Sequence, residues 1–108
     1  MDKVIVDGKV AVLVSHGFGA GWSTWNDVEE MLYDPYIVLM LSDLRDGGSI
    51  DEDRLSNYCT AKYGENVCLL GFGGLTVHWI PEGTAFRINE YDGAESLELR
   101  DESHWFIA

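Results

Sequence analysis

A chain of 108 residues that is 46% hydrophobic and contains four tryptophans is long enough for one domain with a buried core, which excludes a disordered protein. Its 19 acidic and 7 basic residues give a formal net charge of −12, which disfavours duplex nucleic acid and anionic membranes as partners and favours a basic protein. Two cysteines without a Cys-x-x-Cys spacing exclude a disulfide scaffold. Because the sequence has neither a long apolar run nor a basic leader, we expect a soluble cytoplasmic protein. The simplest role of the high net charge is to keep it soluble.

The first elements form a predicted β-hairpin. Asp7 and Gly8 separate two β-rich segments, near residues 3–6 and 9–14, and Asp-Gly favours the positive φ angles of a type I′ turn. The second segment is apolar on both faces, which predicts a central strand.

Residues 14–26, VSHGFGAGWSTWN, carry three glycines and two tryptophans after that strand. Glycine permits unusual backbone angles, and the exposed amides of such a loop can form an anion-binding nest. The glycine spacing and the bulky Trp22 do not fit a dinucleotide-binding loop, and no Walker lysine follows the glycines. The acidic residues after the loop would repel a bound phosphate. The alternatives are a tight bend with Trp22 and Trp25 folded over it, or a ligand or partner groove in which both are anchors. The predicted binding residues are His16, Gly17, Phe18, Gly19, Gly21, Trp22 and Trp25.

Helices are predicted in the middle of the chain. Asn26 is the expected N-cap of a helix that ends near Asp34, before Pro35. Pro35 then opens a short buried helix that closes at Gly47 or Gly48, although a strand is an alternative for so continuous an apolar run. A capping box of Ser49 and Glu52 starts a further helix, which has Leu55, Tyr58 and Cys59 on one face and ends at Gly64.

The last third of the chain is predicted to be β-structure, with strands in segments 66–73, 75–80, 84–91, 95–100 and 104–108. A two-residue turn at Asp92-Gly93 sets the register of one hairpin. It places Tyr91 opposite Ala94, Ile88 opposite Leu97 and Phe86 opposite Leu99, and pairs Arg87 with Glu98. Glu90 then faces Glu95, a like-charge pair that we expect to be exposed rather than to hold a cation.

Other catalytic and metal-binding patterns are incomplete. His16, His78 and His104 share no ligand spacing, and we expect His78 on a sheet face, so no metal or cofactor is predicted. An EF-hand fails because Arg45 and Arg54 occupy ligand positions. Nothing in the sequence supports a Cys-His catalytic pair, so the chain is predicted not to be an enzyme.

Two resemblances extend this interpretation. The segment VAVLVSHGFGAGWSTW is similar to the oxyanion-hole loop of α/β-hydrolases. The segment VCLLGFGGL is similar to the nucleophile elbow of the same family, but it has no hydroxyl or thiol at its tip. In addition, 108 residues are too few for that fold. The segments KVAVLVSHGFGAGWSTWN and WIPEGTAFRINEYDG resemble small uncharacterised proteins of bacteriophages and prophages. This resemblance implies a bacterial cytoplasm and an accessory role without a known activity.

We therefore predict a single α+β domain over residues 1–108, with a mostly antiparallel sheet of five to seven strands and two or three helices on one face. The leading functional hypothesis is a non-enzymatic acidic accessory protein that binds a basic host protein or another host macromolecule, as an inhibitor or nucleic-acid mimic, and forms a homo-oligomer. Mimicry requires the carboxylates to form one contiguous stripe. The alternative is a small-molecule or nucleotide-binding protein that uses residues 17–25 as its pocket wall.

Overall fold

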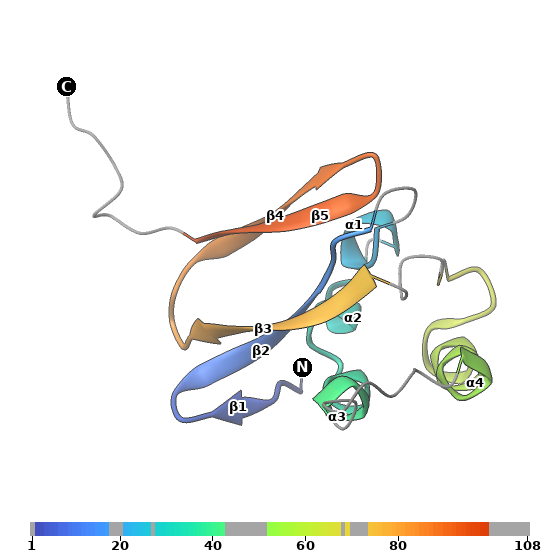
Figure 1. The fold of residues 1–108 in the computed structure, drawn as a ribbon. Helices are drawn as coiled ribbons and strands as arrows, with labels where there is room; N and C mark the ends of the chain where they lie inside the picture. Colours follow the sequence, from blue (N-terminus) through green and yellow to red (C-terminus); the bar gives the residue numbers. More distant parts are fainter. Residues whose placement is uncertain are drawn as a thin grey trace.

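The computed structural model of the chain describes residues 2–17, 21–26, 28–42, 52–67, 69 and 74–99, and these form an α+β fold, as predicted (Figure 1). The elements are β1 (Ile5–Val6), β2 (Lys9–Ser15), α1 (Ser23–Asn26), α2 (Glu29–Tyr33), α3 (Pro35–Ser42), α4 (Glu52–Tyr63), β3 (Leu75–Pro81), β4 (Phe86–Tyr91) and β5 (Ala94–Leu99). No described helix is long and apolar enough to cross a membrane.

The described strands form two antiparallel sheets, so the expected single sheet of five to seven strands is wrong. One sheet has the order β1-β2-β3, and the other is the β4–β5 hairpin. The chain turns after β3, where the Thr84 amide donates to the Pro81 carbonyl oxygen, and β4 does not continue the first sheet. The strands predicted at 66–73 and 104–108 fall largely or wholly outside the described residues.

Both Asp-Gly turns are confirmed. Asp7 and Gly8 have φ angles of 52° and 76°, and Asp92 and Gly93 have φ angles of 50° and 87°, which is the positive pair that a type I′ turn requires. The β4–β5 register also agrees with the prediction at every pair, from Phe86↔Leu99 to Tyr91↔Ala94.

Strand β2 is the centre of the molecule because it is buried on both faces. Ala11 and Leu13 pack into a first core with residues from α2, α3 and α4, and Val12 and Val14 face a second core with the β4–β5 hairpin. Figure 1 shows the resulting layers, with the hairpin on one side of the β1–β2–β3 sheet and α3 on the other. Helix α2 supplies Met31 to the first core and Tyr33 to the second.

All three predicted helices are present, but one predicted N-cap is wrong. Helix α2 ends at Tyr33, before Asp34, and α3 begins at Pro35. Helix α4 buries Leu55 and Cys59 and is followed by Gly64 at a φ of 102°. Asn26 does not cap α2. It is the last residue of α1, its side-chain amide donates to the carbonyl oxygen of Trp22 just before α1, and Val28 stands at the start of α2 without a side-chain cap. The proposed caps at Gly47, Gly48 and Ser49 lie outside the described residues.

Candidate functional site

The predicted binding residues do not share one surface. Trp22 is 0% exposed, and its indole Nε1 donates to the Met31 carbonyl oxygen at 2.8 Å, so this side chain is part of the first core. Trp25 is 44% exposed and donates to Glu90 Oε1 at 3.1 Å. His16 and Gly17 are exposed, whereas Phe18 and Gly19 lie outside the described residues. The position of Trp22 fits the structural alternative for this loop, and Trp25 remains accessible.

Close packing accounts for Gly21 but not for Gly17. Neither residue has a positive φ, so the expectation of unusual backbone angles does not apply to them. A Cβ added at Gly21 would lie 2.6 Å from Thr24 Oγ1 and 2.7 Å from Trp25 Cδ1, whereas one added at Gly17 would meet only the Gly74 Cα at 4.0 Å. The tight position on the facing segment is Gly74, where an added Cβ would lie 2.6 Å from the Gly17 amide nitrogen. Glycine is therefore needed at positions 21 and 74 because other atoms occupy the space of a side chain.

The loop does build an anion nest, and the chain's own Glu95 fills it. The Ser15 amide donates to Glu95 Oε1 at 2.9 Å, and the Trp22 and Thr24 amides donate to Oε2 at 2.9 and 3.1 Å. The Thr24 hydroxyl adds a bond of 2.6 Å to Oε2. These donors are thus already committed to a carboxylate, which leaves them unavailable to a phosphate.

Glu95 is 1% exposed, so the expectation that the Glu90–Glu95 pair is exposed is wrong for one partner. The predicted pairing itself is correct, and Glu90 does lie at the surface. The alternation of the hairpin contained the missing signal, because Glu95 shares its face with Leu97 and Leu99. A carboxylate on an apolar face is buried when donors are available to it, and here the donors are backbone groups.

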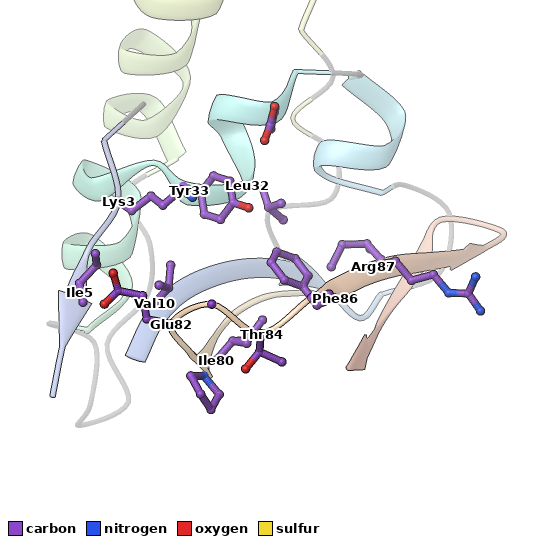
Figure 2. A pocket seen from close by; sticks show the side chains of 15 residues that line it. Lys3, Ile5, Val10, Leu32, Tyr33, Ile80, Glu82, Thr84, Phe86 and Arg87 are labelled. Atoms are coloured by element: carbon purple, nitrogen blue, oxygen red, sulfur yellow. The ribbon is translucent and has the colours of Figure 1, made fainter. Parts of the chain in front are cut away.

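A cavity of about 660 Å³ opens between the two sheets, next to the second core. Figure 2 shows Leu32 and Tyr33 of α2 on one side and Phe86 of β4 on another, with Val10 and Ile80 below them. The remaining lining comes from the N-terminal segment, α2 and the turn between β3 and β4: Lys3, Ile5, Glu29, Pro81, Glu82, Gly83, Thr84, Ala85, Arg87 and Ile88. This volume lies within the range of roughly 300–1,000 Å³ that is typical of small-molecule sites.

Charged groups surround this apolar floor. The Lys3 ammonium lies 4.5 Å from the centroid of the Tyr33 ring, a cation–π contact. Burial and the nearby Glu29 carboxylate raise the pKa of Tyr33, which keeps the phenol neutral. The Arg87 guanidinium points away from the cavity in Figure 2 and bonds Glu98 at 2.8 and 3.0 Å. No ion pair joins Lys3 to a carboxylate in the described part of the chain.

A second polar cluster surrounds Asp34, between α2 and α3. Its carboxylate accepts hydrogen bonds from Tyr58, Lys62 and Tyr63 of α4, and from the backbone amides of residues 36 and 37. Burial alone raises the pKa of Asp34, but these hydrogen bonds outweigh burial and hold the pKa below its ordinary value. This cluster joins α4 to the start of α3.

Cys59 lies beside the Asp34 cluster on the buried face of α4. Burial and the Asp34 charge raise the pKa of its thiol to about 11. A buried thiol in this protonated form is a poor nucleophile. The geometry around Cys59 therefore supports packing rather than covalent chemistry.

Searches against models of protein families, against curated proteins and against solved structures found no match to this chain. The resemblance to phage and prophage proteins consequently stays a prediction.

Proposed function

We propose that the protein is a small-molecule binding protein whose cavity between α2 and the β3–β4 turn takes an organic cation with an apolar body. The observation that carries this proposal is the contact between the Tyr33 ring and the Lys3 ammonium group. It shows that the ring accepts a cation at the edge of a cavity whose floor, Val10 and Ile80, is apolar. The proposal keeps the small-molecule alternative of the sequence analysis but moves its site from residues 17–25 to the cavity.

The charges around the cavity favour a cation over an anion. Glu29 and Glu82 both line it, whereas the Arg87 charge is directed outward and paired with Glu98. Among the described lining residues, Lys3 is then the one whose positive charge, the ammonium group, lies against the apolar wall of the cavity. A net charge of −12 adds a long-range attraction for positive ligands.

The test compares octylammonium, octanoate and octanol by isothermal titration calorimetry on the full chain. We expect octylammonium to bind most tightly, because only this probe gains from the two carboxylates and the ring. Lys3→Ala is the decisive variant, since removing a like charge at about 4 Å strengthens cation binding about fivefold in water. An anion site would respond in the opposite sense, with octanoate preferred and weakened by the substitution.

Matched variants complete this experiment. Glu29→Gln lowers affinity for octylammonium several-fold, while Glu30→Gln, on the same helix but outside the cavity lining, leaves it unchanged. Lys9→Ala is the corresponding control for Lys3, because Lys9 is exposed and does not line the cavity. Equal affinity for all three probes, or no binding at all, would refute the proposal.

The acidic surface supports a second candidate, the binding of a basic host protein. Most described carboxylates are exposed, but they lie on separate parts of the molecule. Asp7 is in the β1–β2 turn and Asp92 in the β4–β5 turn, and Figure 1 shows these turns at opposite ends. That distribution gives less support to a single stripe than to a local site. The test is the capture of a basic protein from a bacterial lysate at low and high salt. Capture that weakens with salt, and that is lost in the double variant Glu90→Lys with Asp92→Lys but kept in Asp7→Lys, would favour this candidate.

A further inference from the structure

His16 and His78 lie 62 residues apart in sequence and meet at the end of the β1–β2–β3 sheet. Their Nε2 atoms share a hydrogen bond of 2.9 Å, in which one ring donates and the other accepts, and a metal ion between them would replace the shared proton. The ring planes are inclined by 61° with centroids 5.1 Å apart. His16 is exposed and His78 is half-buried. Both rings therefore present a nitrogen to the same small volume beside solvent.

The backbone beneath the two rings is fixed by the sheet. His78 pairs with Val12 in the β2–β3 ladder, and the His16 amide extends that ladder by donating to the Gly74 carbonyl oxygen at 3.0 Å. Gly74 has no side chain, and a Cβ there would meet the Gly17 amide nitrogen at 2.6 Å. The close approach of these two glycine-containing segments is what allows His16 to follow the strand and reach His78.

Thr76 lies between the histidines on the same face. Its hydroxyl is 3.2 Å from His78 Nε2 and donates to the Val14 carbonyl oxygen, also at 3.2 Å. The threonine hydroxyl and the His16 ring therefore both lie within hydrogen-bonding distance of His78 Nε2.

We propose that His16 and His78 together bind a borderline divalent metal ion such as Zn²⁺ through their Nε2 atoms. Zinc–imidazole bonds are about 2.0–2.1 Å long, which sets two nitrogens on one ion about 2.8–3.0 Å apart at an angle of 90° and about 3.3–3.4 Å apart at the tetrahedral angle. The observed separation of 2.9 Å fits the smaller angle, and a few tenths of an ångström of ring movement would reach the tetrahedral one. Imidazole suits Zn²⁺, Ni²⁺ and Cu²⁺, whereas Mg²⁺ and Ca²⁺ prefer oxygen ligands.

The described residues supply no group of three or more His, Cys, Asp or Glu side chains placed to hold a metal. The site is separate from the proposed ligand cavity, whose lining includes neither histidine. His16 follows the Ser15–Leu75 end of the β2–β3 ladder and His78 pairs with Val12 in its middle, whereas the cavity is near the Lys9–Pro81 end.

The test is a Zn²⁺ titration of the full chain, followed by calorimetry and by the NMR signals of the histidine rings. We expect one site that shifts the ring signals of His16 and His78, with His16→Gln and His78→Gln each lowering affinity at least about tenfold. Glu82→Gln is the control, since it removes a possible metal-binding carboxylate beyond the opposite, Lys9–Pro81 end of the β2–β3 ladder and should leave affinity unchanged.

Because Zn²⁺ also binds carboxylates, the double variant His16→Gln with His78→Gln measures the background of this acidic chain. Urea midpoints equal to that of the wild type will show that the variants are folded. Wild-type affinity in either single variant, or ring signals that do not move, would overturn the proposal.

Discussion

Two buried carboxylates, Glu95 and Asp34, are each 1% exposed, yet they are satisfied in different ways. Glu95 receives three backbone amides and one threonine hydroxyl, whereas Asp34 receives two tyrosine hydroxyls and a lysine ammonium together with two backbone amides. Glu95 ties the β4–β5 hairpin to the end of β2 and to α1, and Asp34 ties α4 to α3. The difference shows that a buried carboxyl group can be held mainly by the main chain, with no charged partner residue that the sequence would reveal.

The largest expected effect is that of Glu95→Ala. It takes the acceptor from two buried amide bonds and one part-buried one, and each unsatisfied buried donor costs about 1–3 kcal/mol, so we expect a loss of about 3 kcal/mol or more in the free energy of unfolding. Urea denaturation measures this loss. Glu90→Gln is the control, because Glu90 is the exposed cross-strand partner and glutamine keeps the Oε1 acceptor for the Trp25 indole and the Gly93 amide, so we expect little effect. An unchanged midpoint for Glu95→Ala would mean that the nest does not stabilise the fold.

Asp34→Asn is expected to cost less, about 2 kcal/mol, because an amide oxygen in the place of Oδ1 still accepts the bonds from the α3 backbone and from Tyr58, and only the part-buried Lys62 and Tyr63 donors lose their acceptor. The partner Lys62 is 36% exposed in its side chain and can turn to water when the charge is removed. Urea denaturation at neutral pH provides the value, and a loss as large as that of Glu95→Ala would contradict the distinction between the two clusters.

Acid should weaken the Asp34 cluster selectively. Since the pKa of Asp34 is lower in the folded chain than in the unfolded one, its contribution is complete above an unfolded pKa of about 4 and is lost as the pH falls through the folded pKa. The stability of the wild type should therefore decrease below pH 4 more steeply than that of Asp34→Asn. Parallel curves for the two proteins in a pH series of urea titrations would exclude this contribution.

The smallest effects are expected for single side-chain donors. Tyr63→Phe and Thr24→Val each remove one hydroxyl from a carboxylate that keeps other donors, so each should cost about 1 kcal/mol. Lys62→Met should cost no more than this, because the ion pair is partly exposed. A loss above that of Asp34→Asn in any of the three, measured by urea denaturation, would show that one donor dominates its cluster.

Local signals predicted much of the fold. Each Asp-Gly turn determines the conformation of two neighbouring residues, and this was enough to predict the β4–β5 register to the residue. Pro35 and Gly64 likewise mark the start of α3 and the end of α4 through constraints on their own φ angles. The central position of β2 follows from apolar side chains on both of its faces.

The site was harder to predict because its contacts are distant in sequence. His16 meets His78 only after β2 pairs with β3, and nothing within either segment indicates that pairing. Trp22 and Trp25 have the same residue type in one short loop, yet the first is in the core and the second is exposed. The division into two sheets depends on the packing of Phe86 and Ile88 against β2, which also creates the cavity.

The β2–β3 ladder has a consequence for the order of folding. Residues such as Val14 and Thr76 are 62 positions apart, so closing this ladder restricts a long stretch of intervening chain. The β1–β2 and β4–β5 hairpins have short loops and each can form in microseconds, but the central strand gains its second neighbour only after β3 has been synthesised. A nascent chain on the ribosome therefore displays an apolar strand with one open edge until Leu75–Pro81 have been added, and that interval favours aggregation.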